Sequence, residues 1–181
     1  MACTPVGINQ DNESCGTSDG GIRNSYVTDF ANITSATFDV NGQVTAIVMS
    51  GVGLWEKFVY DDDDTAFFNS EGERTGKKHI FNQEAFMKFE GITTAKIAAV
   101  NALRECCNTV WIHRLNSGIA IIQGFEDDGS GNVVRTKQSA KAATSVLSDT
   151  GENADRIEIR VASVCKKIHP TDLTDTEIEA L

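Results

Sequence analysis

The sequence has no uninterrupted apolar stretch near the ~18 residues that a membrane-spanning helix needs, so no membrane span is expected. Its first residues, Met1 to Pro5, lack the basic and apolar regions of a secretory signal, which makes cytosolic synthesis the expectation. Basic residues are scarce, with 16 Lys and Arg against 26 Asp and Glu and a formal net charge of −10. That balance argues against ordinary nucleic-acid binding, which depends on basic patches that neutralise phosphates. It is compatible with solubility alone, or with a surface past which nucleic acid slides because negative charge repels phosphate.

The sequence also lacks paired cysteines. Its cysteine count of five is odd, and no CxxC pair occurs, which fits neither a disulfide framework nor a zinc site. Reduced thiols that behave as small apolar groups are therefore expected. The cysteines are Cys3, Cys15, Cys106, Cys107 and Cys165.

No common catalytic motif is present: the chain has no G-x-S-x-G, P-loop, G-x-G-x-x-G or HExxH. None of its three histidines, His79, His113 and His169, stands at metal-ligand spacing from another histidine or a cysteine. His113 follows Trp111 by two residues on the same predicted strand face, which favours a packed side chain over a base. A Cys106 nucleophile would need His113 close in space, and no local pattern supports that pairing. We expect no enzyme, no cofactor and no metal.

What the sequence does contain is strand signals. Residues 35–40 and 43–49 flank Asn41-Gly42, the strongest short hairpin signal. In the first arm Ala36, Phe38 and Val40 share one face. The second arm carries apolar groups on both faces, which predicts a strand buried between two layers.

A longer hairpin follows the acidic run 61–64. Its arms are predicted at 65–71 and 78–89, around a turn at 72–76. The returning arm alternates with period two, apart from Phe86, which interrupts the polar face. Its apolar face is made of Phe81, Ala85, Met87 and Phe89.

One long helix is predicted at about 94–107, where apolar residues recur every three or four positions behind a threonine cap. Its apolar stripe comprises Ala95, Ala99, Ala102, Leu103 and Cys106. Further strands are predicted at 109–115, 119–125, 133–136 and 156–161. Residues 137–151 are mostly small and polar and receive no strand. Residues 171–181 suit a short acidic helix or a frayed tail.

This order predicts a mainly β chain: an antiparallel β-sandwich or barrel with one flanking α-helix and with extended hairpin and terminal arms. We divide it into an N-terminal arm at 1–20, a β domain at 21–165 and a C-terminal tail at 166–181.

Two acidic segments are the most conspicuous charged features. Adjacent strand residues point to opposite faces, so Asp61, Asp62, Asp63 and Asp64 would not converge on one ion without a tight turn. Two interpretations of this acidic run remain: a solvated loop and an electrostatic lining. The segment 126–132 faintly resembles a calcium loop but lacks its spacing and its closing glutamate.

The stretch from Gly20 to Phe125 resembles the tail tube proteins of long-tailed bacteriophages. The resemblance lies in the order of its parts over roughly 100 residues and not in an invariant signature. Those parts are Tyr26 to Phe30, Gly42 to Ile47, an acidic hairpin closed by Gln83 to Phe89, the helix Thr94 to Glu105, Thr109 to Ile112 and the turn Asn116-Ser117-Gly118. From Val133 onward the likeness fades.

The resemblance implies a structural subunit that forms hexameric rings, stacked into a hollow tube in the virion tail, with other tail proteins as neighbours and DNA passing through the bore without specific binding. It implies a contact between subunits at the hairpin and the terminal arms, with Phe67, Phe68, Arg74, Lys77, Ile80 and Phe81 as candidate contact residues and Asp61 to Asp64 as candidate lumen charges. A tail terminator, a capsid decoration protein and a small-ligand-binding β-barrel remain as alternatives.

Overall fold

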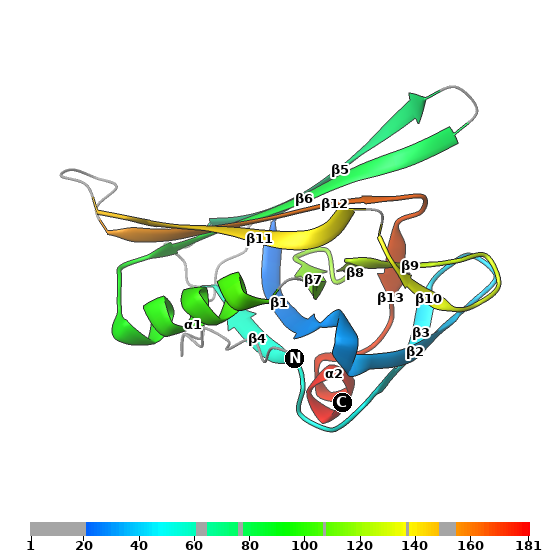
Figure 1. Cartoon of the computed structure of the whole chain (residues 1–181), viewed down its shortest axis with the longest axis horizontal. Coiled ribbons are helices and arrows are strands. Elements are labelled where there is room, and N and C mark those ends of the chain that lie inside the picture. Colours follow the sequence, from blue (N-terminus) through cyan, green and yellow to red (C-terminus); the bar gives the residue numbers. More distant parts are fainter. Residues whose placement is uncertain (1–20, 61–64, 76–77, 107, 137, 149–154) are drawn as a thin grey trace.

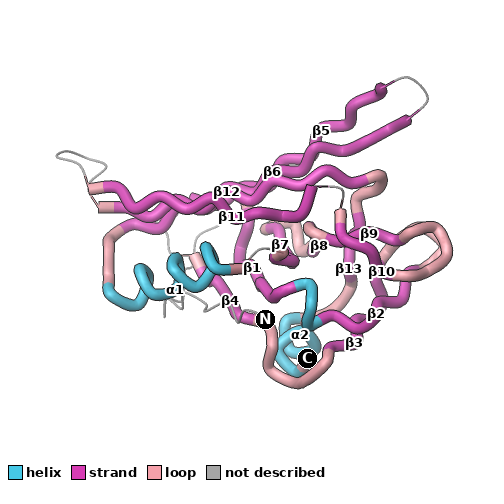
Figure 2. The backbone as a smooth tube through the Cα atoms, viewed as in Figure 1, coloured by secondary structure: helices cyan, strands magenta, loops and turns pink. Residues whose placement is uncertain are grey.

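The computed structural model describes residues 21–60, 65–75, 78–106, 108–136, 138–148 and 155–181. Strands dominate it, which confirms the mainly β prediction (Figures 1 and 2). The strands are β1 (Ile22–Asp29), β2 (Ile33–Phe38), β3 (Val44–Met49), β4 (Glu56–Val59), β5 (Thr65–Thr75), β6 (Lys78–Glu90), β7 (Thr109–Leu115), β8 (Ala120–Gln123), β9 (Phe125–Asp127), β10 (Val133–Arg135), β11 (Gln138–Leu147), β12 (Arg156–Cys165) and β13 (His169–Thr171). The helices are α1 (Thr94–Glu105) and α2 (Asp175–Ala180), with a 3-10 turn η1 (Phe30–Asn32).

Two sheet halves pack face to face as an antiparallel sandwich. We call β5-β6-β12-β11 the outer sheet, and β4-β1-β7-β8 with β13, β3 and β2 the inner sheet. Backbone pairing of Ala140 with Thr109 joins them where β11 meets β7. The sandwich prediction is thus confirmed, and β9 and β10 form a separate small hairpin.

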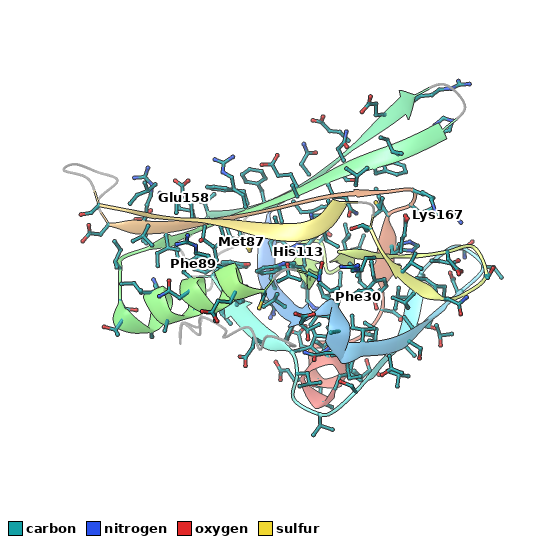
Figure 3. All side chains as sticks on the ribbon, viewed as in Figure 1. Phe30, Met87, Phe89, His113, Glu158 and Lys167 are labelled. Atoms are coloured by element: carbon teal, nitrogen blue, oxygen red, sulfur yellow. The ribbon has the colours of Figure 1, made fainter. Side chains whose placement is uncertain are left out.

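The first hydrophobic core lies between the two sheets and is closed by α1. Alternate residues of β6 and β12 point into it, and in Figure 3 Met87 and Phe89 face α1 while Glu158 points outward. Burying each large apolar side chain stabilises the fold by about 1.5–3 kcal/mol. Its fully buried members include Val27, Phe58, Met87, Phe89, Trp111, Ile157, Ile159 and Val161.

The second core lies on the opposite face of the inner sheet. Tyr26 of β1 and Ile112 of β7 point into it, one residue away from Val27 and Trp111, which face the first core. Strands β1 and β7 are therefore buried on both faces. The second core is covered by β2, β3 and the C-terminal segment, through Ile33, Ala36, Val44, Ile47, Leu173 and Ile178.

Helix α1 begins where the sequence predicts. The Thr93 side chain caps it by accepting a hydrogen bond from the Lys96 backbone N–H at 3.2 Å. Ala99 and Leu103 of the predicted stripe are buried, and Val100 joins them. Ala95, by contrast, is exposed. Its place on the buried face is taken by Lys96, whose ammonium donates to the Glu90 carbonyl at 2.5 Å, so the first turn rests on the end of β6.

The β2–β3 hairpin forms around Asn41-Gly42 as predicted, with Gly42 at φ 87°. Two details differ. Val40 was assigned to the inward face but lies in the turn and is 98% exposed. The expectation that β3 is buried on both faces is wrong, because Thr45 and Val48 face outward.

Strand β11 departs from the sequence prediction. It forms within the small, polar stretch for which no strand is predicted, where pairing with β12 supplies the order that composition does not.

The C-terminal tail at 166–181 contains α2, which confirms the predicted short acidic helix, and β13, which is not predicted. The tail buries Leu173 and Ile178 in the second core. A capping box between Thr174 and Glu177 starts α2.

A chain of buried polar groups connects the two sheets around His113, which is fully buried. Gln123 donates through Nε2 to the carbonyls of Val161 at 3.0 Å and Gln83 at 3.3 Å. Its Oε1 therefore accepts from His113 Nε2 at 3.0 Å, which leaves His113 Nδ1 to accept from the Ser25 hydroxyl at 2.8 Å. The Tyr60 hydroxyl donates to Ser25 in turn, at 2.8 Å. Every donor in this chain meets an acceptor only while His113 is neutral.

The stability of the protein should fall between pH 7 and pH 5. Burial lowers the pKa of His113 from 6.5 to about 4, although the hydrogen bond to Gln123 works in the opposite direction. The unfolded chain then binds a proton near pH 6.5 that the folded chain accepts only near pH 4, so acidification favours unfolding by about 2 kcal/mol over this range. Urea unfolding at pH 7, 6 and 5 measures the change.

The variant His113→Gln should be less stable throughout but should lose this pH dependence. His79→Gln is the matched control, because His79 is exposed on β6, and it should keep the wild-type slope. A free energy of unfolding that is flat in the wild type, or an unchanged slope in His113→Gln, would contradict the assignment.

Candidate assembly surface

The β5–β6 hairpin extends beyond the rest of the protein (Figure 1). Its strands pair in unbroken register from Thr65 opposite Lys88 to Thr75 opposite Lys78. Strand β12 accompanies β6 only as far as Phe81, so the distal end of the hairpin has two strands alone. With about 3.4 Å per residue, β5 spans about 37 Å.

The register of this hairpin differs from the sequence prediction. The predicted turn at 72–76 would set Phe67 and Phe68 opposite Phe81 and Ile80, whereas the structure pairs them with Phe86 and Ala85. The reason is that β5 continues through Gly72 instead of turning there. Gly72 faces Phe81, whose ring would lie 3.3 Å from a Cβ at that position, so this glycine makes room for an aromatic ring.

The two neighbouring phenylalanines of β5 serve different faces. Phe68 points inward, packs against the first core and lies 5.7 Å from the His113 ring, centroid to centroid. Phe67 points outward and is 44% exposed. Its ring lies 5.3 Å from that of Phe86, and the Arg160 guanidinium lies 4.8 Å from the Phe86 centroid. We call Phe67, Phe86 and Arg160 the outward aromatic cluster.

Beyond Ala66, whose carbonyl oxygen lies close to the backbone of Gly21, no described strand covers the free edge of β5. In the described part of the chain no strand pairs with β5 on the side away from β6. The strand has eleven residues, no proline and no bulge. Long regular edge strands with an exposed aromatic side chain are templates for pairing with another chain, and monomeric proteins generally interrupt them. This edge is therefore suited to a contact between subunits.

The outward face of the outer sheet carries charges of both signs, with an acidic excess. Lys88, Arg156 and Arg160 form ion pairs with Glu90, Glu158 and Glu84, the last at 3.6 Å. Glu71 and Glu73 lie on the same face toward the tip. Over the described side chains of β5, β6 and β12, the outward face thus holds five carboxylates (Glu71, Glu73, Glu84, Glu90, Glu158) and three basic groups (Lys88, Arg156, Arg160), a net charge of −2.

The structure brings only some of the predicted contact residues together. Arg74 is exposed near the tip, while Ile80 and Phe81 are half-buried on opposite faces of β6. Lys77 and Asp61 to Asp64 lie outside the described residues. The residues that sequence reasoning missed are Arg160 and Glu84. Phe86 gave a signal by interrupting the polar face, but its partners depend on the register of β12, which no local pattern encodes.

In the described part of the chain, Cys106, His113 and Cys165 are all buried. Cys106 is disulfide-bonded, so the expectation of reduced thiols is wrong at this position. His113 is fully buried, stacks 5.8 Å from Trp111 as a packed residue and uses both ring nitrogens internally. The Cys165 thiol is buried, and its burial, followed by the charge of Glu126, raises its pKa to about 12. A thiol with that pKa is a poor nucleophile at neutral pH.

Binding of a small ligand has little support in the cavities. A hollow of about 200 Å³ lies on the outward face beside Asn69, Asn82 and Ala162. A second, of about 140 Å³, lies between Asp127 and Lys167. Both are smaller than the ~300–1,000 Å³ that is usual for drug-sized ligands.

No group of three or more His, Cys, Asp and Glu side chains within the described ranges could hold a metal ion. No described helix is long and apolar enough to cross a membrane.

Comparison with known proteins gives no relative: no family model, no curated protein and no solved structure matches the chain. Its function must therefore be inferred from the surfaces described above.

Replacing Phe67 and Phe68 by serine, one at a time, should lower the free energy of unfolding by different amounts, because the two rings lie on opposite faces of β5. Phe68→Ser should lower the free energy of unfolding by about 2–3 kcal/mol, because it removes a ring from the first core. Phe67→Ser should cost less than about 1 kcal/mol, because its ring is partly exposed. Urea unfolding of both variants at low protein concentration measures the difference, and equal losses, or a larger loss at Phe67, would contradict the register.

Proposed function

We propose that this protein is a structural subunit of a bacteriophage tail tube that assembles with copies of itself. The observation that carries the proposal is the projecting β5–β6 hairpin, with its open edge and the exposed ring of Phe67. The resemblance of the sequence to tail tube proteins supports it, as does the flanking helix α1 behind the outer sheet (Figure 1).

The outer sheet offers unpaired edges on both sides, which is what a ring needs. On one side is β5. On the other, β11 meets β7 only at Ala140, and no described strand covers its edge from Thr144 to Leu147. Two different edges at opposite sides of one sheet favour a head-to-tail contact, and such contacts close into rings when the rotation per subunit allows it. A ring of six copies is what the resemblance implies.

In such a ring, the hairpin gains a partner for its distal two-stranded end. Two strands alone are marginally stable in water, so Glu73 and Arg74 opposite Ile80 and His79 extend a ribbon with little support of its own. A neighbouring copy that covers this ribbon and the outward aromatic cluster would bury apolar surface that is exposed in the single chain. The hairpin is thus the part of the molecule that gains most from assembly.

Outside this contact, the base of the outward face suits a wall past which DNA moves. There Lys88 pairs with Glu90 and Arg156 pairs with Glu158, so carboxylates weaken the attraction of both basic groups for phosphates. A channel wall of this kind offers DNA no fixed binding site. Location in the virion tail, with other tail proteins as partners, belongs to the same proposal.

Two other virion roles, a tail terminator and a capsid decoration protein, use the same self-association. A small-ligand-binding β-barrel is less well supported, because the two hollows described above are small. No described feature favours an enzyme over these structural roles.

Negative-stain electron microscopy of the purified chain over a range of concentrations tests the proposal. Hollow tubes of stacked rings are the expected result. Isolated rings that never stack would favour a terminator, and particles that stay monomeric at high concentration would overturn the proposal.

The variant Phe67→Lys should abolish or strongly reduce tubes and rings, because it places a charge in the outward aromatic cluster beside Arg160. Val40→Lys is the matched control: it adds the same charge at an apolar side chain that is 98% exposed in the β2–β3 turn. Sedimentation velocity reports the assembly state of each variant, and circular dichroism confirms its fold. Normal assembly of a folded Phe67→Lys variant would exclude this surface as the contact.

A further inference from the structure

The β2–β3 hairpin is attached to the rest of the inner sheet through the C-terminal strand. In the described strands, β3 pairs with β2 on one side and with β13 on the other, and β13 in turn pairs with β8. Strand β13 has three residues, and only Thr171 is in register with β3, opposite Val44. A very short strand from the end of the chain thus lies between an early hairpin and the sheet.

Two side chains of β13 strengthen this connection. The Thr171 hydroxyl donates to the Val44 carbonyl at 2.8 Å. His169 donates through Nδ1 to the Gly42 carbonyl at 2.7 Å, and its ring lies 5.2 Å from that of Phe38. Both residues are nearly fully buried. The C-terminal strand therefore holds the turn end of the β2–β3 hairpin.

Helix α2 closes the second core behind this strand. Ile178 is fully buried and Leu173 is 8% exposed, and together they cover Ile33, Ala36 and Ile47 in the same cluster. Without the C-terminal segment, the inward face of the hairpin would lose part of its cover. The hairpin and the C-terminal segment thus depend on the same core.

The remaining attachments of α2 are polar. Arg114 binds Asp175 at 2.5 Å and the Leu173 carbonyl at 2.6 Å. Asn24 donates to Asp175 at 3.1 Å, and the Tyr26 hydroxyl donates to Glu179 at 3.0 Å. Lys57 binds Glu179 at 2.8 Å, with half of the glutamate side chain exposed, and an ion pair of that kind contributes little and is screened by salt. A six-residue helix and a three-residue strand are also too short to be stable alone.

We infer that residues 169–181 act as a strap, and that β2, β3, β13 and α2 open together as one cooperative unit while the outer sheet, β1 and β7 stay folded. Cooperative units of this kind open at a lower free energy than the whole domain. Opening exposes the edges of β3 and β8 and the apolar side chains of the second core. The inference concerns the single chain and holds whether or not the chain assembles into tubes.

Native-state hydrogen exchange of the full chain, read out segment by segment by mass spectrometry, tests the strap. The variant Ile178→Ala should accelerate exchange in α2, β13, β2 and β3 by at least about thirtyfold, the factor that corresponds to about 2 kcal/mol for a truncated buried isoleucine. In the wild type, β6, β12 and β7 should exchange more slowly than these four elements, because they open only when the whole domain unfolds. Thr171→Val, a milder change that removes the hydroxyl bond to Val44, should accelerate the same four elements by a smaller factor.

Leu103→Ala is the matched control, because it truncates a side chain in the first core that is 1% exposed. It should accelerate exchange in the outer sheet and leave β2 and β3 unchanged. The strap is refuted if Ile178→Ala accelerates α2 and β13 but not β2 and β3. It is refuted equally if Leu103→Ala accelerates β2 and β3 by the same factor as the outer sheet, since the domain would then open only as a whole.

Discussion

The relative placement of the two sheets depends on the buried chain from Tyr60 through Ser25 and His113 to Gln123. Gln123 reaches the carbonyls of two adjacent outer strands at once, at Gln83 and Val161. A shift of one residue would withdraw both carbonyls and leave the amide without acceptors inside the protein, which costs about 1–3 kcal/mol for each buried polar group. The chain therefore fixes which residues of β6 and β12 face inward, and with them the outward position of Phe86 and Arg160.

The sequence predicts those elements of the fold that are determined by residues close together in the chain. The β2–β3 hairpin, helix α1 and the alternation of β6 follow from Asn41-Gly42, the Thr93 cap and period-two burial, and each is encoded within about a dozen residues. Strand β11 is ordered by β12, so its small polar residues carry no signal. The short acidic helix of the C-terminal segment is predicted, but its burial in the second core through Leu173 and Ile178 depends on distant strands and is not.

The register of the β5–β6 hairpin differs from the sequence prediction, and Gly72 explains why. A glycine between two polar runs reads as a turn, whereas here it accommodates the ring of Phe81 across the strand. That single difference moves the partner of Phe67 by five residues, from Phe81 to Phe86. It also places Phe67 in the outward aromatic cluster and Phe68 against the first core.

The outer sheet and the C-terminal strap differ in the free energy at which they open. The projecting hairpin grows from the strands that hold the first core, where Ala85, Met87, Ile159 and Val161 are fully buried, so its base is rigid and its free edge keeps a fixed direction. The C-terminal strap lies at the other side of the inner sheet (Figure 1) and is held by two apolar side chains and by partly exposed ion pairs. An edge strand positions a neighbouring copy only if its own sheet does not move. Because the strap opens without disturbing that sheet, the contact surface on β5 keeps its geometry while the second core fluctuates.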